Sequence, residues 1–259
     1  MGQNTFNKKK HISEVLSLFE KRTKANKTKY NTNHKRIIEI FDDKIAKHTY
    51  LFFSIKKNNE SEKKGNRAFY LPQYLCAIAN NYYALKEVFQ KGLQVQVLVL
   101  LRNQFELINA LISFITDDNY FDCVTKFIEQ KDSLISPDNK NSKKIVKEIL
   151  KKMSKETIGE NWKDYNTKYD SLYHLLSEPA HGNLLKVSMF SFFIDENKEG
   201  VLYPAIGGGF KPMGKAIEIL MDTLDYFDLA FIIILGELIK KNYCDKKSES
   251  YKTLIQLMK

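Results

Sequence analysis

The stretch that decides the fold is residues 93–115, LQVQVLVLLRNQFELINALISFI, which is apolar along most of its length. Four polar side chains recur in it at helical spacing: Arg102, Glu106, Asn109 and Ser113. They fall on one narrow stripe of a helix that is otherwise apolar nearly all round. Such a helix belongs in the centre of a core, where a buried guanidinium and carboxylate are costly unless each has a partner. The sequence therefore predicts a central helix whose polar stripe needs partners.

Two interpretations of this stripe are open. Arg102 and Glu106 stand four residues apart, so they can form a structural ion pair with each other, although arginine before glutamate is the weaker order on a helix. Alternatively, Glu106 fixes one side of the guanidinium and the free side binds a phosphate or carboxylate bidentately. Asn109 and Ser113 would extend that strip.

The second candidate region is residues 177–182, SEPAHG. Pro179 lacks an N–H and pushes Glu178 towards extended geometry, and Gly182 permits a tight turn, so the chain is predicted to leave the helix here. His181 would then sit on a constrained bend. An imidazole with a pKa of about 6.5 suits a general acid or base, but a turn histidine can also simply tie two elements together by hydrogen bonds.

Metal binding has little support in the sequence. Glu178 and His181 copy half of a carboxylate-bridged two-metal pattern, but no second Glu-x-x-His occurs. Three widely spaced cysteines, Cys76, Cys123 and Cys244, exclude a zinc knuckle and a disulfide framework. We expect no metal and no cofactor.

Composition predicts a globular cytoplasmic protein. Of the 259 residues, 43% are hydrophobic, which is enough for a well-buried core, and an odd number of cysteines fits a reducing compartment. The N-terminus has no apolar run typical of a signal peptide. The apolar segment from Ala216 to Leu238 is interrupted by acidic side chains, so we expect no membrane insertion.

The net charge of +10 is unevenly distributed. Residues 1–67 contain 17 basic and 7 acidic side chains, and residues 68–259 contain 24 of each. A basic segment beside a neutral body is typical of proteins that contact phosphate backbones, although lysines on an exposed helix often do no more than solvate it. The candidate nucleic-acid-binding residues are Lys8, Lys9, Lys10, Lys35 and Arg36.

The periodicity along the chain is overwhelmingly helical, which predicts a mainly α helical bundle. After a polar lead, apolar residues repeat at helical spacing over 34–55, 66–91, 93–115, 118–131, 143–153, 162–176 and 213–241, with a final short helix. Gly92 is predicted to end the second of these. One small β-hairpin is expected over residues 186–206, which are rich in Val, Phe, Tyr and Ile. We expect a basic helical region over 1–67 and a helical core over 68–259, as one continuous globular unit.

Two motifs resemble those of a family of bacterial helical proteins of unknown function: LLRNQFE at residues 100–106 and LSEPAH at residues 176–181. The resemblance covers roughly residues 70–240 and implies a mostly helical fold without an established activity. It points to a shared polar set of Arg102, Glu106, Ser177 and His181, which are our candidate catalytic residues.

A more distant resemblance is to the HEPN superfamily, which includes metal-independent ribonucleases of toxin–antitoxin and phage-defence systems. Its activity depends on an arginine and a histidine spaced as R-x4-6-H, whereas no histidine follows Arg102 at that distance. His181 would have to replace it through folding. This resemblance implies an RNA-acting defence or toxin-like protein. A non-catalytic interaction module, or a nucleotide or small-ligand sensor, is the alternative, and a homodimer is plausible in each case.

Overall fold

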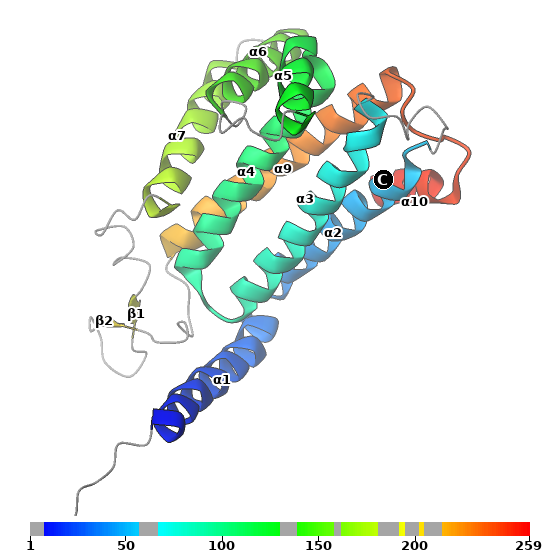
Figure 1. The fold of residues 1–259 in the computed structure, drawn as a ribbon. Coiled ribbons are helices and arrows are strands. Elements are labelled where there is room, and N and C mark those ends of the chain that lie inside the picture. Colours follow the sequence, from blue (N-terminus) through cyan, green and yellow to red (C-terminus); the bar gives the residue numbers. More distant parts are fainter. Residues whose placement is uncertain are drawn as a thin grey trace, which may run out of the picture.

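The chain forms a mainly helical bundle, as the periodicity predicts (Figure 1). This computed structural model describes residues 8–56, 67–129, 139–157, 162–180, 192–194, 202–204 and 214–259. The helices are α1 (Lys8–Asn33), α2 (Lys35–Ser54), α3 (Arg67–Gln90), α4 (Gln94–Thr116), α5 (Asp118–Glu129), α6 (Asn139–Thr157), α7 (Trp162–Ala180), α9 (Gly214–Lys240) and α10 (Glu249–Leu257).

Two short strands, β1 (Phe192–Ile194) and β2 (Leu202–Pro204), pair antiparallel with Phe193 opposite Tyr203. The residues between and around them lie outside the described part of the chain. The hairpin over residues 186–206 therefore stays a prediction.

The predicted central helix, α4, is the hub of the bundle. It packs against α3, α5, α6, α7 and α9, and its side chains Leu101, Phe105, Ile108 and Leu111 are fully buried. By length and composition α4 would be able to cross a membrane, but 67% of its most apolar window is buried inside the bundle. A helix that is apolar nearly all round is found in the core, and α4 occupies that position here.

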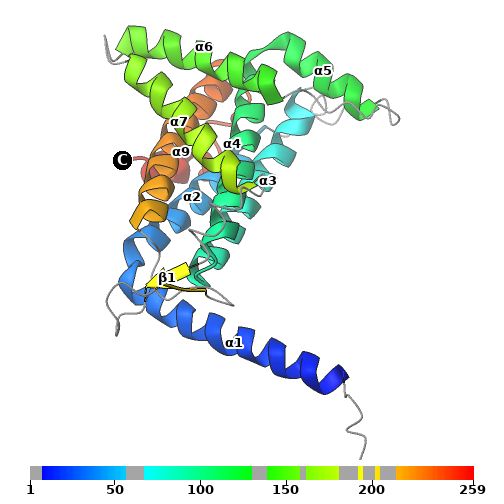
Figure 2. The same ribbon diagram turned by 90° about the vertical axis from the view of Figure 1, so that its left-hand side faces the viewer.

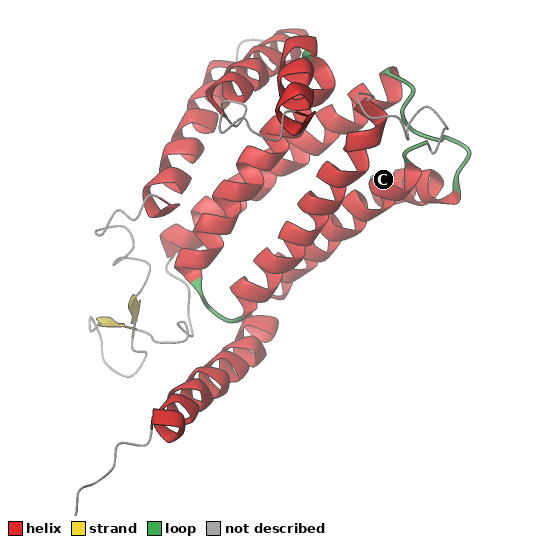
Figure 3. Cartoon of the chain, viewed as in Figure 1, coloured by secondary structure: helices red, strands yellow, loops and turns green. Residues whose placement is uncertain are grey.

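The turn between α3 and α4 depends on a glycine, and it is one of the short loops visible in Figure 3. Gly92 has a φ of 73°, a left-handed conformation that glycine adopts without strain. The turn lets the N–H of Leu93 donate to the carbonyl of Val88 at 3.2 Å, which satisfies one carbonyl at the end of α3. The prediction that Gly92 ends this helix is confirmed.

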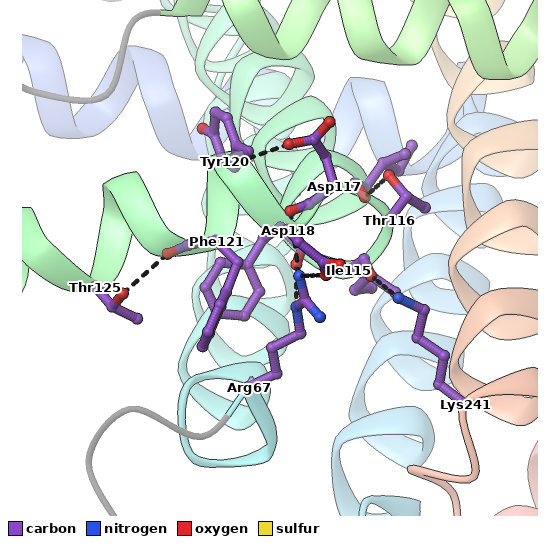
Figure 4. Close-up of polar contacts among 11 residues, drawn as sticks. Arg67, Ile115, Thr116, Asp117, Asp118, Tyr120, Phe121, Thr125 and Lys241 are labelled. Atoms are coloured by element: carbon purple, nitrogen blue, oxygen red, sulfur yellow. Dashed lines mark hydrogen bonds and ion pairs between the residues drawn. The ribbon is translucent and has the colours of Figure 1, made fainter.

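The C-terminal end of α4 is capped by one cation from the start of α3 and one from the turn after α9 (Figure 4). Arg67 donates from Nε to the carbonyl of Phe114 at 3.0 Å, and Lys241 donates from Nζ to the carbonyl of Ile115 at 2.6 Å. Positive charge is favourable at this end of a helix because the last carbonyls lack intrahelical partners. Asp117 then caps the start of α5 by accepting a hydrogen bond from a backbone N–H of its first turn.

Helix α1 is half anchored and half projecting. Near its C-terminal end, Asn26 donates to the carbonyl of Lys91 at 2.8 Å, and the fully buried Tyr30 packs edge-on against Phe89. Its N-terminal half extends away from the bundle (Figures 1 and 2). The residues before His34, expected as a polar lead to the basic helical region, form a helix of 26 residues.

Helix α7 is longer than predicted. The expected exit from the helix at Ser177 is wrong, because α7 continues through Pro179 to Ala180. Pro179 removes the hydrogen bond to the carbonyl of Leu175, four residues earlier, and only Ala180 follows it in the helix. His181 and Gly182 lie outside the described residues.

Candidate functional site

Arg102 lies at the contact between α4 and α7 and is only 6% exposed. Its guanidinium forms an ion pair with the carboxylate of Glu106, one turn further along α4. The guanidinium carbon lies 3.6 Å from the centre of the Tyr173 ring, and Nη1 reaches the Tyr173 carbonyl at 3.5 Å, a long hydrogen bond. A buried arginine is stabilised by this combination of charge pairing and stacking on an aromatic ring. The guanidinium therefore joins α4 to α7.

Ser177 lies on the same part of α7. Its hydroxyl donates to the carbonyl of Tyr173, four residues earlier, at 2.6 Å. Such a back-bond inside a helix commits the hydroxyl proton to a backbone carbonyl and not to a neighbouring base. The structure thus brings Arg102 and Ser177 together at the Tyr173 carbonyl, with Glu106 paired to Arg102, whereas His181 lies outside the described residues.

Sequence reasoning missed two lysines that complete this contact from α6. Lys143 Nζ lies 3.9 Å from the centre of the Tyr173 ring and 3.2 Å from a carboxylate oxygen of Asp170. Lys147 forms an ion pair with the other oxygen of Asp170. Burial raises the pKa of Asp170, but the hydrogen bonds and charges of Lys147 and Lys143 outweigh burial, so the pKa lies below its ordinary value. The only signal in the sequence was the spacing of four between the two lysines.

The rest of the predicted stripe is also satisfied inside the protein. Asn109 donates from Nδ2 to the hydroxyl of Tyr169 on α7 at 2.9 Å, and its Oδ1 accepts from the hydroxyl of Tyr226 on α9 at 2.6 Å. Burial raises the pKa of both tyrosines, so both hydroxyls keep their protons. Ser113 donates to the carbonyl of Ser142 at 3.3 Å. Every polar side chain of the stripe thus has a partner on a neighbouring helix or on α4 itself.

A second buried polar cluster, on α2 and α9, was not predicted. The side chain of Lys44 is 2% exposed, donates to the carbonyl of Leu224 at 2.9 Å and pairs with Asp228 at 2.6 Å. His48 shares a hydrogen bond of 2.8 Å between Nδ1 and the Lys44 carbonyl, and its Nε2 has no hydrogen-bond partner among the described residues. Burial lowers the pKa of His48 to about 4. Lys44 and His48 extend the spacing of the buried Ile37 and Phe41, a signal the sequence analysis did not use.

The candidate nucleic-acid-binding residues lie on α1 and at the start of α2. Lys9, Lys35 and Arg36 are exposed, and Lys35 pairs with Glu39 at 3.5 Å. Lys8 and Lys10 belong to the first turn of α1. Figure 1 shows these two helices meeting end to end where α1 leaves the bundle. Lys9 and Arg36 are thus open to solvent, and Lys35 shares its charge with Glu39.

The motif resemblances have no independent support beyond these residues. No protein-family profile matches the chain, and comparison with curated proteins and with solved structures finds no significant match.

Proposed function

We propose that this protein is a non-catalytic helical interaction module that binds RNA, or a polyanion of similar charge, through its basic N-terminal helix. The observation that carries the first half of the proposal is the environment of Arg102. Its charge is paired with Glu106, its plane is stacked on Tyr173, and it is nearly buried. A phosphate would have to displace these partners to reach it.

The same contacts argue against a reactive role for the other described candidates. Ser177 uses its hydroxyl proton within α7, and Glu106 accepts from Arg102. A group that works as a nucleophile or general base needs a free lone pair or proton within reach of a substrate. The polar set is better explained as a network that fixes how α7 packs on α4.

The second half of the proposal rests on α1. Residues 8–24 contain six basic and two acidic side chains. Among them, Lys21 and Lys24 are exposed and lie on a different side of α1 from Ile12, Val15 and Phe19. Each phosphate that such a lysine neutralises releases counterions, which favours binding at low salt. A projecting helix with this charge is suited to follow a nucleic-acid backbone without reading its sequence.

The test is fluorescence anisotropy with a labelled single-stranded RNA at ~0.1 M salt. We expect the double variant Lys21→Glu/Lys24→Glu to bind about tenfold more weakly or worse, because two attractive charges become repulsive. The matched control is Lys246→Glu/Lys247→Glu, which makes the same charge change at exposed positions before α10. Equal losses in both variants, or none in either, would refute binding through α1.

Finer expectations from the sequence stand as separate proposals. They are a HEPN-like origin, a role in antiviral defence or in a toxin–antitoxin pair, and a β-hairpin over residues 186–206. The first two rest on Arg102, which would open an R-x4-6-H motif that no histidine completes at the required distance, and the strand pair β1–β2 supports the third.

A further inference from the structure

The N-terminal half of α1 carries an apolar stripe that nothing in the described part of the chain covers. Ile12, Val15, Leu16 and Phe19 follow the spacing i, i+3, i+4, i+7 and are between 40% and 56% exposed. We call these four residues the arm stripe. The stripe continues towards Asn26, which is buried against the bundle and bonded to the Lys91 carbonyl. The same face of α1 is thus buried against the bundle near Asn26 and exposed to solvent along the arm stripe.

A groove elsewhere on the molecule has complementary properties. Helices α7 and α9 both pack on α4 more than on each other, and they leave a cavity of about 350 Å³ between them. Its apolar lining includes Leu172, Leu175 and Leu229, and the exposed Asp222 and Asp225 stand at its α9 edge. We call this cavity the α7–α9 groove.

The two features match in length and charge. The arm stripe spans eight residues, about 10 Å of helix, and the groove is lined over comparable lengths of both helices, Thr167–Leu175 and Asp222–Leu229. Three consecutive lysines at positions 8–10 precede the arm stripe in the sequence, and the α9 edge of the groove carries Asp222 and Asp225. Apolar contact flanked by opposite charges is typical of an amphipathic helix bound in a groove.

We infer that the α7–α9 groove binds the α1 arm of a second copy of this chain. The arm cannot fold back into its own groove, because α1 is a continuous helix fixed to α3 by its C-terminal half and its N-terminal half points away from the bundle (Figure 2). Each copy offers one arm and one groove, so a two-fold pair that exchanges arms satisfies both surfaces. This inference is independent of RNA binding, because Lys21 and Lys24 lie on the other side of α1.

The experiment is sedimentation equilibrium of the full chain and two variants, followed by a mixture of the variants. The arm variant Leu16→Asp/Phe19→Asp and the groove variant Asp222→Lys/Asp225→Lys each lose one of the two surfaces, and all four positions are exposed, so both should fold. We expect wild-type protein to self-associate, each variant alone to associate at least tenfold more weakly, and an equimolar mixture to form a heterodimer through the one intact arm and the one intact groove.

Controls make each outcome decisive. Phe53→Asp changes an apolar residue as exposed as Leu16, 56% in both cases, on a different surface and should leave association unchanged. Circular dichroism melting confirms that each variant is folded. A monomeric wild-type protein at 100 μM would overturn the inference, and so would a groove variant that associates as well as wild type or a mixture that stays monomeric.

Discussion

At the scale of single residues, Arg102 shows why a polar side chain in an apolar helix does not by itself mark an active site. The sequence left open whether it pairs with Glu106 or holds an outside anion. The structure pairs it with Glu106 and adds the ring and carbonyl of Tyr173. These partners account for the buried charge without a ligand.

If Arg102 is structural, removing it should destabilise the protein. We expect Arg102→Ala to lower the free energy of unfolding by about 2 kcal/mol, because the half-buried Glu106 carboxylate loses its partner and the contact with Tyr173 is lost. Urea denaturation measures this change. Lys252→Ala, which removes one member of the exposed pair with Glu249, should stay within about 0.5 kcal/mol and serves as the control. An Arg102→Ala protein as stable as wild type would show that the pair is not structural.

His48 should make stability depend on pH. Its pKa is about 4 in the folded protein, where burial lowers it, and about 6.5 when unfolded. Between these values the unfolded state binds the extra proton, so stability falls as the pH drops from about 6.5 to 4, by about 3 kcal/mol. We expect His48→Gln, which has no titrating ring, to lose this part of the pH dependence in urea denaturation between pH 4 and 7. Parallel profiles for the two proteins would contradict the assignment.

At the scale of elements, sequence periodicity located most helices. It did not predict the long helix α1 before His34, and it predicted too early an end for α7. The stretch before His34 has few apolar residues and many lysines, so it looked like a polar lead. It is helical over 26 residues: Ile12, Val15, Leu16 and Phe19 already have helical spacing, and Asn26 and Tyr30 anchor its far end to the bundle, which is a tertiary effect. Pro179 was given too much weight, since a proline in the last turn costs little.

The two halves of α1 should contribute differently to stability. Deleting residues 1–20 should change the melting temperature by no more than about 2 °C, because the anchoring residues Asn26 and Tyr30 remain. Deleting residues 1–33 removes the fully buried Tyr30 and should lower the melting temperature by about 10 °C or more. Differential scanning calorimetry distinguishes the two deletions. Equal effects would mean that the projecting half is also part of the folded core.

The candidate site was predictable only in part, because local spacing fixes which residues share a face of one helix but not their partners on other helices. The spacing of Arg102, Glu106, Asn109 and Ser113 identified one polar face of α4 correctly, because helical geometry fixes which residues share a face. It did not identify Tyr173, Lys143 or Tyr226, because partners on other helices depend on tertiary packing. Lys44 was overlooked because a lysine among apolar positions is normally at the surface, whereas here Asp228 and a backbone carbonyl on α9 satisfy it.

At the scale of the whole molecule, the bundle and the projecting helix α1 carry different kinds of surface. The bundle places α4 at its centre and satisfies the polar stripe internally, whereas α1 projects with a lysine side and an apolar side. We propose that the bundle acts as a scaffold and that the projecting helix is the part that meets partners.

Binding of RNA through α1 should depend strongly on salt. We expect the logarithm of the binding constant to fall linearly with the logarithm of salt concentration, because phosphate contacts release counterions. For single-stranded RNA, Lys21→Glu/Lys24→Glu should make the slope shallower by about 1.4, on the order of 0.7 for each lost contact. Anisotropy titrations at several salt concentrations measure both slopes. An unchanged slope would place the RNA elsewhere on the protein.

The most direct test of the central claim, that the protein binds RNA without cutting it, uses one end-labelled single-stranded RNA and two gels. Wild-type protein at saturating concentration is incubated with the RNA, with EDTA or with Mg²⁺, and samples are run on native and denaturing gels. We predict an RNA that is shifted on the native gel and intact on the denaturing gel under both conditions. Cleavage that persists in EDTA and disappears in a folded Arg102→Ala or His181→Ala protein would contradict this account and establish a metal-independent ribonuclease.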